Sequence, residues 1–173
     1  MKEQQKKYEL TGEFIEHQSG KKLYRIRALV SFGVVAAGQL GGFVESENNL
    51  DQSLSGNAWV SGNARVSGNA WVSGNARVYG DAWVYGDAQV SGNAWVRSYA
   101  VISERKMIFW ASNVGSEYGT LTVFNGKDGL IVTRGCFTGT VDEFLSKSAE
   151  VHDDKTKNEY KLLIEVAKSR IQG

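Results

Sequence analysis

Residues 55–96 consist of seven tandem six-residue units: SGNAWV, SGNARV, SGNAWV, SGNARV, YGDAWV, YGDAQV and SGNAWV. A weaker unit, NLDQSL, precedes them from Asn49, and another, RSYAVI, follows from Arg97. A period of six does not fit the 3.6-residue turn of an α-helix, where a glycine in every unit would cost about 1 kcal/mol each time. Collagen has a period of three and needs proline, which this chain lacks. The repeat therefore indicates a β-helix.

Each position of the unit has a distinct physical role. The final valine is β-branched, which suits a short strand that points into a core. The alanine two residues earlier faces the same way and must be small where walls converge. Glycine and Asn or Asp tolerate positive φ and are expected at the corners. The residue between alanine and valine is predicted to point outward.

The pattern resembles the left-handed parallel β-helix of hexapeptide-repeat proteins, in which three units make one triangular coil. The resemblance implies three coils over residues 49–102, with left-handed connections. Residues 1–48 are predicted to form an N-terminal β-hairpin cap, and residues 103–173 a C-terminal α+β domain. The fold class expected is mainly β.

The outward positions alternate between aromatic and polar side chains, namely Trp59, Arg65, Trp71, Arg77, Trp83, Gln89 and Trp95. Residues 18 apart should stack on one face at the strand spacing of about 4.8 Å. Trp59, Arg77 and Trp95 are then predicted to form one column, with the cation between two indoles. By the same spacing Arg65, Trp83 and Val101 share a second face, and Trp71 and Gln89 share the third.

Such columns have two interpretations. They stiffen the exposed walls, or they form an interface, because Trp, Tyr and Arg are enriched at binding hot spots. The interface hypothesis includes two bulkier corners, Tyr79 and Tyr85, and predicts a homo-oligomer. Resemblance to hexapeptide acyltransferases implies a trimer, and a dimer that packs Trp59 and Trp95 across a two-fold axis is the alternative. The candidate interface residues are Trp59, Arg65, Trp71, Arg77, Tyr79, Trp83, Tyr85 and Trp95.

The flanking segments predict caps for the two open ends of the coil. YELTGEFIEHQSGKK and KKLYRIRALVSF read as a hairpin with a Ser-Gly turn, followed by a tight turn at Gly41-Gly42. KMIFWASN, GTLTVFNG and GLIVTRGCF read as three strands. Two capping boxes, Thr140 with Glu143 and Thr156 with Glu159, predict two helices. The second helix carries an apolar stripe expected in the core: Tyr160, Leu163, Ile164, Ala167 and Ile171.

Composition narrows the function classes. The formal net charge of +1 offers no field that would attract nucleic acid, and no stretch has the length and apolarity of a membrane span. The single cysteine, Cys136, fits a reducing cytoplasm and is predicted to be a small buried residue. No Cys/His spacing predicts a metal site, and nothing predicts a cofactor. His17 and His152 lie outside the repeat and are expected to be surface residues rather than catalytic ones.

The whole chain resembles a family of uncharacterised hexapeptide-repeat proteins found in bacteriophages and prophages. The resemblance rests on YRIRAL and GQLGGFVESENNL before the repeat, on the SGNA and YGDA units, and on RGCFTGTVDEF after it. It implies a phage-related origin but supplies no functional residues. Members are sometimes labelled as transferases because hexapeptide acyltransferases share the helix.

Three functional hypotheses follow. The favoured one is a non-enzymatic binding protein that occupies a host protein, including a defence component, or sequesters a small signalling molecule. A protein-blocker would use a flat aromatic wall, whereas sequestration needs concave pockets with aromatic and arginine side chains. A hexapeptide-type acyltransferase is the alternative, and it would need a histidine base at a cleft, which the coil lacks. A virion or lattice component is the third.

Overall fold

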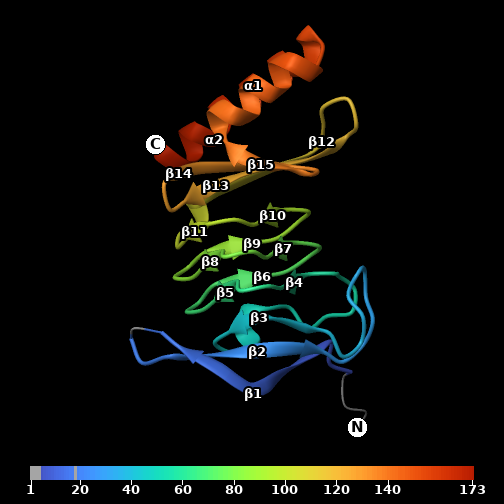
Figure 1. The fold of residues 1–173 in the computed structure, drawn as a ribbon, viewed down its shortest axis with the longest axis vertical. Coiled ribbons are helices and arrows are strands. Elements are labelled where there is room, and N and C mark those ends of the chain that lie inside the picture. The colour runs from blue at the N-terminus through green and yellow to red at the C-terminus, as the bar shows by residue number, and fades with distance from the viewer. Residues whose placement is uncertain (1–4, 18) are drawn as a thin grey trace.

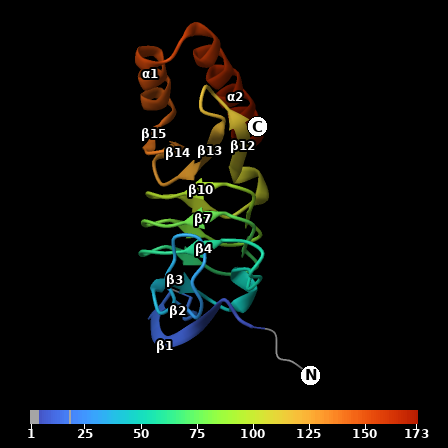
Figure 2. The same ribbon diagram turned by 90° about the vertical axis from the view of Figure 1, so that its right-hand side faces the viewer.

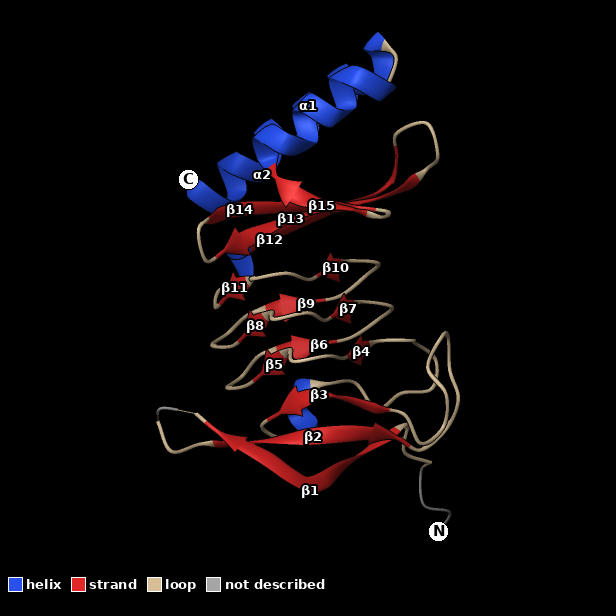
Figure 3. Ribbon diagram, viewed as in Figure 1, coloured by secondary structure: helices blue, strands red, loops and turns tan. Residues whose placement is uncertain are grey.

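The computed structural model describes residues 5–17 and 19–173 and stacks three parts along one long axis. An N-terminal sheet lies at one end, the coil lies in the middle, and a second sheet with two helices lies at the other end (Figure 1). Strands dominate, and the two α-helices gather at the C-terminal end (Figure 3). The mainly β fold class is confirmed.

The coil is built from two-residue strands that pair in parallel on three walls. The first wall holds β4 (Trp59–Val60), β7 (Arg77–Val78) and β10 (Trp95–Val96), which Figure 2 shows one above another. The second wall holds β5 (Arg65–Val66), β8 (Trp83–Val84) and β11 (Val101–Ile102). The third holds β6 (Trp71–Val72) and β9 (Gln89–Val90). A parallel β-helix is confirmed, and its left-handedness stays a prediction.

The inward positions form one continuous core. Every repeat valine is fully buried, and the alanine two residues before each is buried beside it. The corners carry glycines with positive φ, from Gly62 (+62°) to Gly92 (+61°). A Cβ added at Gly74 would lie 3.0 Å from the backbone nitrogen of Gly92 in the next coil. Glycine is therefore needed at these corners both for φ and for the close approach of adjacent coils.

The coil begins before the tandem units. Strand β3 (Leu40–Val44) pairs in parallel with β5, and Leu50 forms a parallel bridge with Val72. The predicted tight turn at Gly41-Gly42 is wrong, because both glycines lie inside β3. A Cβ at Gly41 would meet the carbonyl oxygen of Val60 at 2.5 Å, so the residue is small to let the first coil pack.

A β-hairpin caps the N-terminal end. Strands β1 (Tyr8–Glu16) and β2 (Lys22–Ala28) are antiparallel, as predicted, and extend the second wall in the order β1-β2-β3-β5-β8-β11. Their turn includes Gly20, at φ +82°, while Gln18 lies outside the described residues. A short 3-10 turn, η1 (Glu47–Asn49), places the Asn49 amide 2.9 Å from the Ala70 carbonyl, to which it donates. These contacts satisfy backbone groups at the open end of the coil.

A four-stranded antiparallel sheet caps the other end. After the 3-10 turn η2 (Arg105–Met107), it runs β12 (Ile108–Val114), β13 (Gly119–Gly126), β14 (Gly129–Arg134) and β15 (Phe137–Thr140). Thr122 Oγ1 accepts from the backbone nitrogen of Trp95 at 3.2 Å, and Thr133 Oγ1 donates to the Trp95 carbonyl at 2.7 Å. Two side chains of the sheet thus replace the strand that a further coil would supply.

Two helices pack on this sheet. Helix α1 (Val141–Val151) begins at the predicted capping box of Thr140 and Glu143. Helix α2 (Asp154–Gln172) does not begin as predicted, because the Asp153 carboxylate accepts from the Thr156 nitrogen at 2.8 Å and caps the helix instead. This hydrogen bond holds the pKa of Asp153 below its usual value. The predicted apolar stripe is buried, with Leu163 only partly so. No helix in the described ranges combines the length and apolarity of a membrane span.

Candidate functional site

The outward columns follow the predicted register. Trp59 and Trp95 both pair with Arg77, Arg65 pairs with Trp83, and Trp71 pairs with Gln89. The guanidinium carbon of Arg77 lies 5.4 Å from the centre of a Trp95 ring, a cation–π contact. The predicted register is therefore confirmed, but the cation–π contact of Arg77 is with Trp95 alone, so the prediction of a cation between two indoles is only half met. The register also places the three columns on separate walls, two with tryptophan and arginine and one with Trp71 and Gln89, so they do not form one continuous aromatic surface.

Trp59 does not point into solvent. Its ring meets Phe32 edge-on at 5.4 Å and Tyr8 at 6.4 Å, and the residue is only 4% exposed. The expectation that Trp59 is free for a second molecule is corrected, because residues 29–39 fold back over the first wall. The burial of Trp59 leaves Arg77 and Trp95 as the accessible part of the column.

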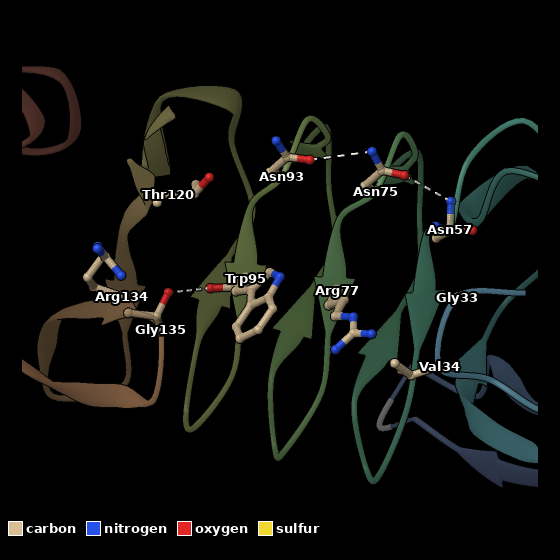
Figure 4. Close-up of a pocket in the computed structure, with 12 residues that line it drawn as sticks. Gly33, Val34, Asn57, Asn75, Arg77, Asn93, Trp95, Thr120, Arg134 and Gly135 are labelled. Atoms are coloured by element: carbon tan, nitrogen blue, oxygen red, sulfur yellow. Dashed lines mark hydrogen bonds between the residues drawn. The ribbon is translucent and has the colours of Figure 1, made fainter. Parts of the chain in front are cut away.

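A cleft of about 400 Å³ lies over this accessible part; we call it the first-wall cleft (Figure 4). Its floor is Arg77 and Trp95, on neighbouring strands of the wall. Val34, which is 75% exposed, stands at one end, and Arg134 of β14 stands at the other. The remaining lining residues come from the corner and from the two caps: Gly33, Asn57, Asn75, Asn93, Gly119, Thr120, Thr133 and Gly135. Segments far apart in the sequence thus enclose one concave site.

Asparagines line one side of the cleft in a row (Figure 4). The Asn57 backbone nitrogen donates to Asn75 Oδ1 at 3.2 Å, and Asn75 Nδ2 donates to Asn93 Oδ1 at 3.4 Å. The sequence assigned these residues to corners, and their 18-residue spacing is the signal that aligns them. Arg134 is a lining residue that the sequence did not single out, since it lies outside the repeat.

A second space, the side cavity, adjoins the cleft. It holds about 240 Å³ and shares Val34 and Arg77 with the cleft. Tyr79, predicted as a candidate, lines it and interacts with Arg97, whose guanidinium donates to the Tyr79 hydroxyl. The other lining residues are Val35, Gln39, Trp59 and Ser61.

The second wall carries a separate aromatic group. Trp83 stacks on Tyr85 with 4.3 Å between ring centres, and the His17 ring approaches Trp83 at 4.9 Å. These residues line a cavity of about 300 Å³ together with Lys21, which forms an ion pair with Glu45 at 3.4 Å. His17 therefore contacts the coil from the hairpin, a proximity that the sequence did not indicate.

Other predicted residues take ordinary places. Arg65 is exposed on the second wall, and Trp71 is partly buried on the third. His152 Nδ1 lies 2.9 Å from Ser148 Oγ, between the helices. Cys136 was predicted to be buried and is exposed, because it lies in the turn between β14 and β15. Within residues 5–17 and 19–173, no group of three His, Cys, Asp or Glu could hold a metal ion.

Comparison with known families matches only the coil. A family model described as the YdcK beta solenoid repeat matches residues 58–74 and again residues 70–86. Both matches lie within the coil and span strands β4 to β8 with their corners, so sequence and structure agree on a repeat β-helix. No curated protein matches the chain.

Proposed function

We propose that the chain is a non-catalytic binding protein that holds a small molecule in the first-wall cleft. The observation that carries the proposal is the cleft itself, a concave site of about 400 Å³. Sites for small molecules span roughly 300–1,000 Å³ and combine apolar walls with a few directed polar groups. A flat aromatic wall would favour a protein partner instead, but Trp59 is covered by Phe32 and Tyr8.

The chemistry of the cleft favours binding over catalysis. Its described lining offers arginine, asparagine, threonine, tryptophan, valine and glycine. An arginine stays protonated, and an amide or hydroxyl is a poor base near neutral pH, so none of these groups is suited to take a proton from a substrate. They can hold and orient a ligand.

Within the bacteriophage setting that the family resemblance implies, the captured molecule would be a host signalling molecule. Its capture would take place in the host cytoplasm and counter a host defence. Occupying a host protein, or serving as a virion or lattice component, are the competing proposals. Both competing proposals predict a contact with another macromolecule, and neither requires a small molecule in the cleft, so experiment can separate them from the first proposal.

Native mass spectrometry of the protein isolated from its host tests the proposal. We expect a bound small molecule, released on denaturation. Thr120→Trp should abolish this mass excess by filling the cleft, while Thr138→Trp, at an exposed position of β15 outside the cleft, should keep it. A wild-type chain that carries a protein partner and no small molecule would overturn the proposal.

The acyltransferase alternative has one supporting observation, the cavity that contains His17, Lys21 and Trp83. A histidine in a cavity is a candidate general base. Turnover of an acyl-CoA by the wild type, lost in His17→Ala, would favour this alternative. We expect no turnover by either protein.

We also propose that the chain forms a homo-oligomer, dimeric or trimeric, through the third wall. Trp71 is partly buried there and makes neither an aromatic nor a cation–π contact with the described residues, whereas Trp59 and Trp83 contact other rings and Trp95 contacts Arg77. An indole left against solvent gains from burial in an interface.

A further inference from the structure

Arg77 stands at the boundary between the first-wall cleft and the side cavity. It lines both spaces, the cleft of about 400 Å³ and the side cavity of about 240 Å³. One face of its guanidinium lies over Trp95. Among the described residues, no acceptor forms a hydrogen bond or an ion pair with the Arg77 side chain. A guanidinium carries five N–H donors, so this group is positioned without the acceptors that it can bind.

Other donors around the site also lack acceptors. The indole nitrogen of Trp59, which lines the side cavity, is buried and has no acceptor among the described residues. Arg97 lies 5.7 Å from the Trp95 ring; its Nη2 donates to the Gly135 carbonyl at 2.7 Å, but its Nε is buried without a partner. A buried donor without an acceptor is costly, and two of the four such side-chain atoms among the described residues, those of Trp59 and Arg97, lie beside this site.

Negative charge is scarce at the same place. The described lining of the two spaces contains two arginines, Arg77 and Arg134, and no aspartate or glutamate. Arg134 has an ion pair with Glu117 at 3.7 Å, but that carboxylate is 81% exposed and lies outside the lining. Solvent screens such a pair strongly. The site therefore has an excess of positive charge and of hydrogen-bond donors.

We infer that the ligand of the first-wall cleft is a small anionic molecule whose charged group binds Arg77 at the boundary between the two spaces. This inference rests on the proposed function and specifies its ligand. The uncharged polar part of the molecule lies along Asn57, Asn75 and Asn93. Their amides present both donors and acceptors without charge, which suits the hydrogen-bonding edge of a planar ring. Guanidinium binds phosphate or carboxylate through paired hydrogen bonds, so the anion is one of these two.

The repeat supplies a matched control for Arg77. Arg65 occupies the same position of its unit, but on the second wall, where it is exposed and outside both spaces. Its donors face solvent. Replacing each arginine by glutamine removes one charge from an equivalent strand, and only one of the two replacements touches the cleft.

Calorimetric titration with three probes tests the inference. AMP carries a phosphate and a planar base, orotate carries a carboxylate on a planar ring, and adenosine carries no charge. We expect the wild type to bind AMP or orotate at least tenfold more tightly than adenosine, with an affinity that falls as salt is raised. Arg77→Gln should weaken the bound anion at least tenfold, and Arg65→Gln should leave it unchanged. The stronger of the two anions identifies the group as phosphate or carboxylate.

The inference is overturned if adenosine binds as well as both anions, if no anion binds, or if Arg77→Gln binds the anion like the wild type. The comparison of AMP with adenosine uses the wild type alone, so it stands even where a variant folds poorly. The two proposals fail separately. If the Arg77→Gln protein still carries a small molecule in native mass spectrometry, the proposed function stands. The inference that an anionic group binds Arg77 is then wrong.

Discussion

The ring of Phe32 meets the ring of Trp59 edge-on, with 5.4 Å between their centres, and so joins a loop of the N-terminal cap to the first coil. The contact makes Trp59 a core residue, although it occupies an outward position of the repeat. Trp59→Ala should therefore lower the free energy of unfolding by about 3–5 kcal/mol, the usual cost of removing a large buried aromatic side chain. Urea denaturation measures the loss.

Trp71 is the matched control for that experiment, since it holds the same position in its unit but is only partly buried. Trp71→Ala should cost clearly less at a concentration where the chain is monomeric. Equal losses for the two variants would mean that Phe32 and Tyr8 contribute nothing through Trp59.

Val78 tests the core of the coil. It is fully buried between Val60 and Val96 of the adjacent coils. Val78→Asp should unfold the coil, because an unpaired buried carboxylate costs several kilocalories per mole. Circular dichroism should show the loss of β structure. Gln89→Asp introduces the same charge at an exposed outward position and should leave the spectrum unchanged. A folded, soluble Val78→Asp chain would contradict the inward placement of the valines.

Lys7 gives a pH dependence with a defined sign. Its ammonium group is buried, donates to the Ala58 carbonyl at 2.9 Å, and burial lowers its pKa from 10.5 to about 8. Between these two values the unfolded chain binds more protons than the folded chain, so the contribution of Lys7 to stability rises with pH across that window. Urea denaturation at pH 7.5 and 9.5 measures it. In Lys7→Met, the rise should be smaller than in the wild type by the share due to this group.

Sedimentation velocity tests the homo-oligomer. At micromolar concentration the wild type should sediment as a dimer or trimer, and Trp71→Ser should shift it toward the monomer, since that indole is proposed to lie in the contact. Gln89→Ser, next to it on the third wall, removes no aromatic surface and serves as the control. A monomeric wild type would contradict the proposal of a homo-oligomer. If Trp71→Ser is as oligomeric as the wild type, the contact between subunits lies in one of the caps instead.

The repeat made the coil predictable in detail. A strict period of six converts distance along the chain into position on a wall, so the inward valines and the pairing of Arg77 with Trp95 follow from counting. The segments outside the repeat have no period, so fewer of their structural features could be predicted. The hairpin strands and the first capping box were predicted from local patterns, which act within a few residues.

Long-range contacts account for the errors. Nothing near Trp59 indicates that Phe32 covers it, and nothing near Arg134 indicates that it faces the coil, because both contacts join a cap to the repeat. The exposure of Cys136 depends on where a turn falls between two strands, and the start of α2 depends on competition between two acceptors, Asp153 and Thr156. The two ends of the candidate cleft are formed by such contacts, so only its floor and its row of asparagines, both set by the repeat, could be predicted.

Because residues 18 apart stack on one wall, the number of coils sets the distance between the two caps. Duplicating or deleting 18 residues would keep every wall in place and change the gap between Val34 and Arg134 by about 4.8 Å per coil. Adding only six or twelve residues would instead carry the C-terminal sheet round to another wall and take Arg134 away from Arg77. Lineages that gain or lose whole coils could therefore resize the same cleft for shorter or longer ligands, whereas gains of a single unit would dismantle it.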